Sequence, residues 1–176
     1  MSGYSRGNPA MGDVVRSVLV LGAIVLALWF VGRLVTVTPD QPTSDADWRT
    51  AASGVEPRAG FTPLVPPQLP DGWRATRAEL VEDRWQLNVV TRDGDFVGLS
   101  QRPGDAKTLK QLVEDRAEAS DADGAARIGG KAWEVFTSGE DTTLARVVGR
   151  EAVVVTGSAP RDVLQDYVAS LVPFSP

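Results

Sequence analysis

The residues that could do covalent chemistry in this sequence are few, because the 176 residues include no His and no Cys. Their absence excludes thiol nucleophiles, thiolate metal sites, disulfides and every scheme that uses an imidazole base. Gly157-Ser158-Ala159-Pro160 has the outline of a nucleophile elbow, but no His exists to activate Ser158. A Ser ahead of a helix is typically its N-cap, and we predict that role for Ser158.

Two acidic motifs could bind a cation. Asp121-Ala-Asp123-Gly124 opens like a calcium loop, yet the sixth and twelfth loop positions are Ala126 and Ala132, where an EF-hand needs Gly and Glu. We therefore predict an acidic turn that ends a helix. Asp93-Gly94-Asp95 offers two carboxylates, but its Asp-Gly pair is typical of a hairpin turn. We predict no metal site and no cofactor.

Paired carboxylates are the acid–base scheme that remains open. Residues 39–176 hold 22 acidic side chains, so some pairs must lie close together. A domain of about 115 residues has little room for a substrate cleft, and no catalytic motif accompanies the carboxylates. We expect a protein that is not an enzyme, and a carboxylate-only hydrolase is our third hypothesis.

Three tryptophans, Trp73, Trp85 and Trp133, could line a ligand pocket. As single aromatic residues on or beside predicted strands, they are more often part of a hydrophobic core. Both interpretations stay open, and the pocket interpretation supports a small-molecule or lipid-binding module.

The charge of the chain argues against a nucleic-acid partner. Residues 39–176 carry 15 basic and 22 acidic side chains, a net charge of −7, and the sequence shows no basic stripe. Arg74, Arg77, Arg84 and Arg92 could bind an anion, although scattered Arg on an acidic surface usually forms solvated pairs.

An apolar segment near the N-terminus predicts a transmembrane helix at residues 17–37. These 21 residues hold one charge, Arg33, near their end, and would form a helix of about 31 Å, which is enough to cross a bilayer. Val35-Thr36-Val37 is a poor signal-peptidase site, so we expect an uncleaved anchor. Arg6 and Arg16 favour a cytoplasmic tail at residues 1–16. The rest would lie outside the cytoplasm, anchored to the cell membrane.

The part after the anchor divides into a linker at 38–60, with a short helix near Asp47–Ala52 capped by Asp45 or Asp47, and an extracytoplasmic domain at 61–176. The linker is polar and Pro-bearing. The Pro-rich residues 61–73 must be extended and irregular, and we expect them to lie across the domain surface.

Alternating apolar residues and tight-turn signals predict an antiparallel sheet, and two stretches have helical spacing. One helix would begin at Thr108 in a capping box with Gln111. The other would be opened by Ser158 and Pro160. The fold class is therefore α+β, an antiparallel sheet packed with two main helices. The predicted strands are Ala75–Val81, Trp85–Thr91, Phe96–Gln101, Ala125–Ile128, Lys131–Phe136, Leu144–Val148 and Ala152–Thr156.

Six sequence blocks after residue 47 together form a recognisable pattern: Leu64–Pro66, Leu69–Thr76, Trp85–Leu87, Gly94–Gln101, Gly129–Trp133 and Val153–Ala159. These blocks resemble those of a family of actinobacterial membrane-anchored proteins, known as a domain of unknown function. This resemblance implies one N-terminal anchor and an outer domain, but no activity and no functional residues. At the level of fold, the chain is similar to the α-β-α sandwich of the Mog1/PsbP type, whose members serve as accessory factors.

Together these features predict a membrane-anchored, extracytoplasmic accessory domain of the cell envelope that binds a protein partner without catalysis. The alternative is a module that binds a small molecule or a lipid.

Overall fold

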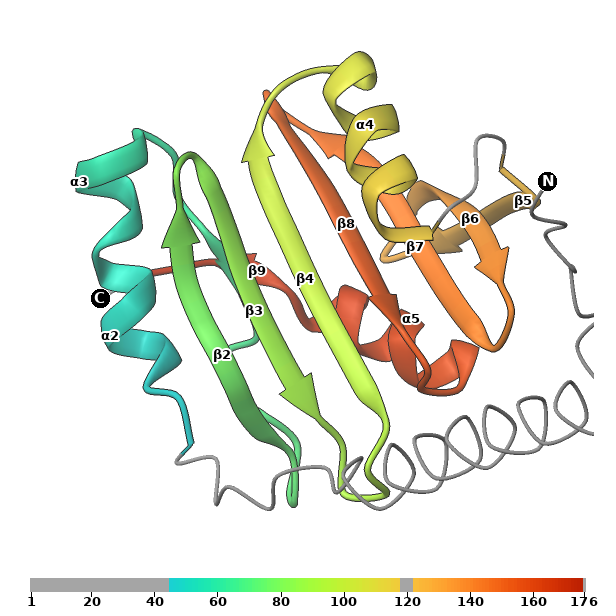
Figure 1. The fold of residues 1–176 in the computed structure, drawn as a ribbon, viewed down its shortest axis with the longest axis horizontal. Helices are drawn as coiled ribbons and strands as arrows, with labels where there is room; N and C mark the ends of the chain where they lie inside the picture. Colours follow the sequence, from blue (N-terminus) through green and yellow to red (C-terminus); the bar gives the residue numbers. More distant parts are fainter. Residues whose placement is uncertain (1–44, 118–121, 176) are drawn as a thin grey trace, which may run out of the picture. The chain divides into compact units, whose positions relative to one another are not determined.

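The computed structural model describes residues 45–117 and 122–175, which belong to one compact unit spanning Thr43–Pro176. The chain forms four helices and nine strands within these residues (Figure 1). The helices are α2 (Trp48–Ser53), α3 (Val55–Ala59), α4 (Ala106–Ala117) and α5 (Arg161–Ser170). The strands are β1 (Leu64–Val65), β2 (Arg74–Val81), β3 (Arg84–Val90), β4 (Phe96–Pro103), β5 (Gly124–Ile128), β6 (Lys131–Ser138), β7 (Asp141–Val148), β8 (Glu151–Gly157) and β9 (Val172–Pro173).

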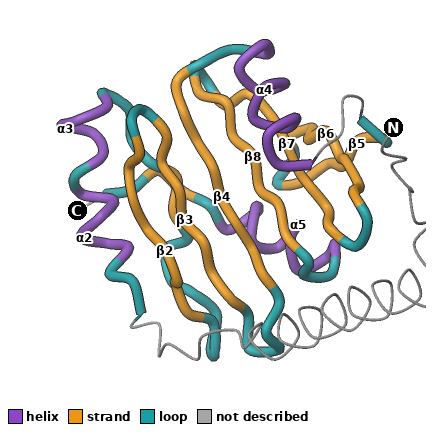
Figure 2. The backbone as a smooth tube through the Cα atoms, in the orientation of Figure 1, coloured by secondary structure: helices purple, strands orange, loops and turns teal. Residues whose placement is uncertain are grey.

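Seven strands form one antiparallel sheet in the order β2-β3-β4-β8-β7-β6-β5. Short turns join β2, β3 and β4 into one meander and β5, β6, β7 and β8 into another (Figure 2). The pairing of β4 with β8 unites the two meanders. Gly94, Gly130 and Gly149 take positive φ in these turns, as tight hairpins require. The predicted α+β class with an antiparallel sheet is confirmed. The likeness to the Mog1/PsbP type stays a prediction.

Strand β8 shows how the sheet holds one helix on each face. Its side chains alternate between two cores: Val153 and Val155 pack with Leu164 of α5, whereas Ala152 and Val154 pack with Leu112 of α4. Successive residues of a strand point to opposite faces, so α4 and α5 cover opposite sides of the sheet (Figure 1). Both helices bury the apolar stripes that their spacing predicts.

A two-stranded ribbon, β1 with β9, lies on the α5 side of the sheet. Val65 pairs with Val172, and the N–H of Phe174 donates to the carbonyl of Pro63 at 2.8 Å. The ribbon joins two segments far apart in the sequence, since β9 follows α5 at the C-terminal end. The sequence analysis did not predict this pairing.

Two buried side chains fasten the ribbon to the sheet. Gln101 of β4 accepts the N–H of Leu64 at 2.6 Å and donates to the carbonyl of Thr62 at 3.1 Å. The indole N–H of Trp85 donates to the carbonyl of Leu64 at 3.1 Å. Gln101 and Trp85 face each other on β4 and β3 and are 1% and 0% exposed. We call these three hydrogen bonds the clamp.

The folded unit begins earlier than the predicted boundary at residue 61. Residues 48–59, assigned from the sequence to a linker with a short helix near Asp47–Ala52, form α2 and α3, and their Trp48, Ala52 and Val55 belong to the core. The Pro-rich segment is also more than a surface strap, because Val65 is buried there and contributes a strand. Apolar packing against the sheet orders both segments.

Both predicted helix caps in the second half of the chain are wrong. α4 begins at Ala106, and the carboxylate of Asp105, instead of Thr108, accepts the N–H groups of Lys107 and Thr108. The hydroxyl of Ser158 caps no helix, because it accepts the N–H of Phe96 at 3.1 Å. In α2, by contrast, Asp47 is the cap, one of the two residues proposed.

The predicted cytoplasmic tail at 1–16 and membrane span at 17–37 lie outside the described residues. Within 45–117 and 122–175, no helix has the length and apolar character needed to cross a bilayer.

The clamp predicts that Gln101→Met destabilises the domain although Met fits the space. The substitution leaves the N–H of Leu64 and the carbonyl of Thr62 without partners, so we expect the free energy of unfolding to fall by about 2–4 kcal/mol. Denaturant unfolding of the full chain, followed by Trp fluorescence, measures the change. Gln111→Met on the exposed side of α4 is the matched control, expected within about 0.5 kcal/mol of wild type. Equal effects of the two substitutions would contradict the role of the clamp.

Candidate functional site

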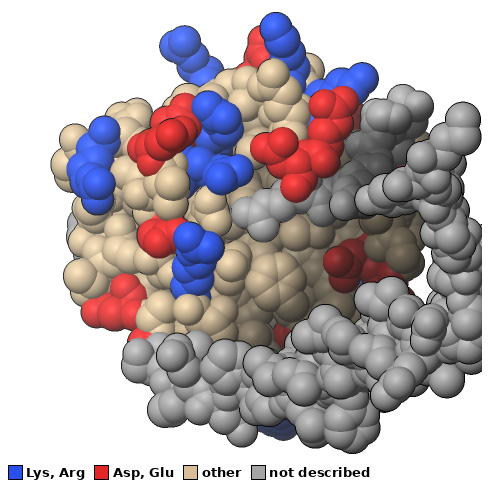
Figure 3. Space-filling view, in the orientation of Figure 1, with Lys and Arg blue, Asp and Glu red and all other residues tan. Residues whose placement is uncertain are grey.

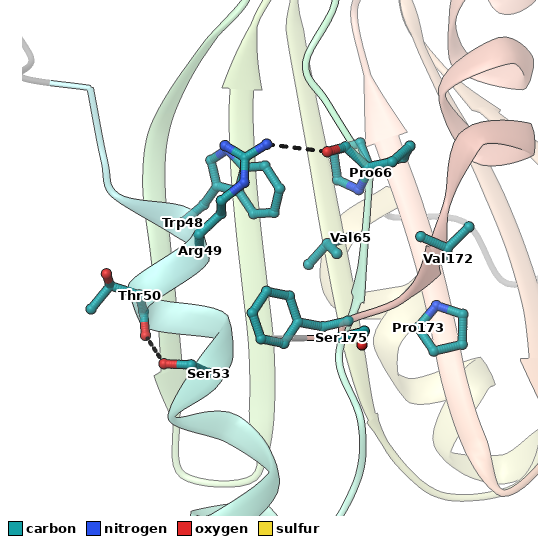
Figure 4. A pocket seen from close by; sticks show the side chains of 11 residues that line it. Trp48, Arg49, Thr50, Ser53, Val65, Pro66, Val172, Pro173 and Ser175 are labelled. Atoms are coloured by element: carbon teal, nitrogen blue, oxygen red, sulfur yellow. Dashed lines mark hydrogen bonds between the residues drawn. The ribbon is translucent and has the colours of Figure 1, made fainter.

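An open groove runs between α2 and the β1–β9 ribbon and has a volume of about 620 Å³. Figure 4 shows the side chains that line it, with α2 on one side and the ribbon on the other. The lining residues are Trp48, Arg49, Thr50, Ser53, Val65, Pro66, Pro67, Val172, Pro173, Phe174 and Ser175.

The helical wall of the groove depends on the cap of α2. The carboxylate of Asp47 accepts the hydroxyl of Thr50 at 2.6 Å and its N–H at 3.1 Å. These hydrogen bonds, led by the one from the Thr50 side chain, lower the pKa of Asp47 from its ordinary value. The cap satisfies the first turn of a six-residue helix, which needs such support because so short a helix is unstable alone.

Arg49 crosses the groove from α2 to the Pro-rich segment. Its guanidinium lies 4.3 Å from the ring centre of Trp48 and donates to the carbonyl of Pro67 at 3.1 Å (Figure 4). Stacking on an indole and one hydrogen bond fix the position of a cation that is otherwise exposed. Arg49 is the single charged residue in the lining.

The ribbon supplies the apolar wall. Val172 is 42% exposed, one of two large apolar side chains that stand out from the described surface, and Val65 lies buried beside it. Pro66, Pro67 and Pro173 have no backbone N–H, so the groove offers carbonyl acceptors but few donors. Pro173 also removes a donor from the outer edge of β9, which disfavours addition of another strand there.

The three tryptophans of the predicted pocket lie elsewhere. Trp85 is fully buried in the clamp, and Trp133 is buried under the guanidinium of Arg146, 5.7 Å from its ring centre. Trp73 stacks on Tyr167 with ring centres 5.9 Å apart. All three contribute to one core, and none lines the groove. Trp48, on the predicted short helix, lines the groove, and the sequence analysis did not select it.

Two further hollows lie beside α4. One, of about 910 Å³, contains Asp105, Arg150 and Glu151 where α4 begins, and another, of about 350 Å³, lies beside α4 and β6. Hydrogen bonds from the first turn of α4 lower the pKa of Asp105, whereas a general acid needs a raised one. No group of three or more acidic side chains in the described residues could hold a metal ion.

Tyr167 is the described residue whose pKa changes most. Its hydroxyl is buried without a hydrogen-bond partner, and burial raises its pKa above the ordinary value of 10.0. The neutral phenol is therefore favoured in the folded state. Above pH 10 the unfolded chain loses this proton while the folded chain keeps it, so stability falls as the pH rises.

We expect Tyr167→Phe to raise the free energy of unfolding by about 1 kcal/mol, since it removes a buried polar group that has no partner. The variant should also lose less stability than wild type between about pH 9 and about pH 11. Denaturant unfolding at several pH values measures both effects. Tyr167→Leu, which removes the stacking on Trp73, should be destabilising. A loss of stability in Tyr167→Phe would show that the hydroxyl has a partner.

Comparison with known proteins gives a family but no activity. No curated protein matches the chain. Among solved structures, the chain is similar to the one described as the crystal structure of MucB in complex with MucA(peri), with 15% identity and a TM-score of 0.37. The match covers 64% of this chain and 37% of that chain, so the chain spans little more than a third of its length. Residues 6–171 match the family described as "Protein of unknown function (DUF4245)", and the chain therefore belongs to the DUF4245 family.

Proposed function

We propose that this chain is a single-pass membrane protein whose outer domain binds a protein partner in the cell envelope and catalyses no reaction. The groove between α2 and the β1–β9 ribbon carries this proposal. It combines an exposed apolar side chain, Val172, with a fixed cation, Arg49, on a domain otherwise rich in exposed polar residues. An exposed apolar site beside a few oriented polar groups is typical of recognition surfaces.

The composition of the groove supports binding in place of catalysis. Its polar side chains are Arg49, Thr50, Ser53 and Ser175, and none of the described residues that line it carries a side-chain carboxylate. Without a base, none of these hydroxyls is activated as a nucleophile. A guanidinium has N–H donors but no acceptor for a proton, so Arg49 serves to position a charge.

The open shape of the groove suits an extended peptide better than a lipid chain. The groove is open to solvent along α2, whereas acyl-chain sites bury most of their ligand. The carbonyl of Pro67 and the hydroxyls of Ser53 and Ser175 lie along it, where the N–H groups of a peptide could meet them. A small molecule or lipid remains the second candidate, favoured by the apolar wall around Val172.

The proposed location rests on the sequence. The apolar residues 17–37, the flanking Arg6 and Arg16, and the acidic remainder support an anchor with a cytoplasmic N-terminus and the folded domain outside. A tether of this kind restricts the search for partners to the membrane surface, which raises the effective concentration of other envelope proteins.

Site-specific photo-crosslinking in native membranes tests the proposal. A photo-reactive amino acid at Ser53, an exposed position in the groove, should give a discrete adduct with one protein. The same amino acid at Lys107, exposed on α4 across the sheet from the ribbon, is the control and should give none. Mass spectrometry of the adducts identifies the partner.

A lipid or metabolite adduct at Ser53 would favour the second candidate. Adducts of equal yield from both positions, or none from Ser53, would contradict a binding role for the groove.

A further inference from the structure

We propose that the partner segment bound in the groove is an extended apolar peptide with a single carboxylate, which Arg49 recognises. This inference rests on the proposed function and adds the chemistry of the partner. It follows from the position of Arg49, the lack of an ion pair for it among residues 45–117 and 122–175, and the surrounding apolar wall.

The guanidinium of Arg49 is held in place before any partner arrives. The Trp48 ring lies against it, and the bond to Pro67 uses one of its N–H groups. The remaining N–H groups are available, in the planar arrangement that binds a carboxylate through two parallel hydrogen bonds. A fixed side chain loses little conformational entropy on binding, so the arrangement favours affinity.

No ion pair of the described residues includes Arg49. The positive charge of Arg49 contributes to the lowered pKa of the nearby Asp47. The carboxylate of Asp47, however, is engaged in capping α2. A cation that the described part of the fold positions without pairing it to a carboxylate is suited to one from a partner.

The lining of the groove around Arg49 determines which side chains the partner needs beside its carboxylate. Val65, Val172 and Phe174 offer apolar contact on the ribbon side. The three proline rings remove N–H donors, so Arg49 is the strongest donor available to an incoming acceptor. Apolar side chains next to one carboxylate would satisfy both features.

The charge of the whole domain argues for one carboxylate and against an acidic run. Residues 39–176 carry a net charge of −7, which repels a strongly acidic partner at long range. On the face shown in Figure 3, basic and acidic side chains are interspersed, so that face offers no basic patch to attract such a run. Recognition by Arg49 is therefore local.

The test is selection from a displayed library of random twelve-residue peptides by the full chain in lipid nanodiscs. Wild type should enrich peptides with Asp or Glu beside apolar residues, whereas Arg49→Glu should lose this preference and enrich Lys or Arg. Arg58→Glu makes the same change of charge at an exposed position of α3 and should select like wild type. Denaturant unfolding confirms that each variant is folded.

A selected peptide, made with Glu or with Gln at the enriched acidic position, gives the quantitative test. Wild type should bind the Glu form about tenfold more tightly, because a charged hydrogen-bonded pair contributes about 1.4 kcal/mol or more. In Arg49→Gln the ratio should fall to about one. Fluorescence anisotropy of labelled peptides measures the affinities.

The outcomes separate this inference from the proposed function. Peptides that bind wild type and compete at the groove without an acidic preference would overturn the role of Arg49 and leave peptide binding intact. A ratio unchanged in Arg49→Gln would do the same. If no enriched peptide loses its binding when Val172→Asp is introduced into the groove, both this inference and the proposed function are overturned.

Discussion

The three hydrogen bonds of the clamp determine how the rest of the domain can be arranged. Residues 61–70 contain four prolines, so this segment cannot join the main sheet as an ordinary strand. Gln101 and Trp85 instead satisfy the backbone of Thr62 and Leu64 with side chains. Once held there, the segment presents its other edge to β9, which brings the C-terminal residues across the sheet and creates the ribbon wall of the groove.

This arrangement explains why a polar residue lies at the centre of an apolar core. Gln101 stands in a row between Trp85 and Val153, both buried. An unpaired amide at that place would be costly, but both ends of this one are hydrogen-bonded. The same core contains a polar group without a partner, the hydroxyl of Tyr167. We therefore expect removal of the Gln101 amide to destabilise the domain and removal of the Tyr167 hydroxyl to stabilise it, although both are buried polar groups.

Much of the fold was predictable from the sequence, because alternation in strands and helical spacing are local patterns. The seven strands of the main sheet and helices α4 and α5 all coincide with predicted segments. The first residue of a helix was less predictable, because several polar residues near the start of α4 could cap it. The spacing of Thr108 and Gln111 indicated a capping box, but the carboxylate of Asp105 accepts the N–H groups of the first turn. Glu82 takes positive φ in the β2–β3 turn, where Gly or Asn would have been the sequence signal.

The candidate site was not predictable, because it is assembled from three separate segments. Arg49, Val65 and Val172 come together only after β1 pairs with β9, and no short motif encodes that pairing. The most direct test of the account is hydrogen exchange at one amide, that of Leu64. A two-residue strand should normally exchange fast, but the bond to Gln101 predicts protection as strong as that of core amides in β3. Fast exchange at Leu64 with β3 and β4 protected would contradict the clamp and the groove built on it.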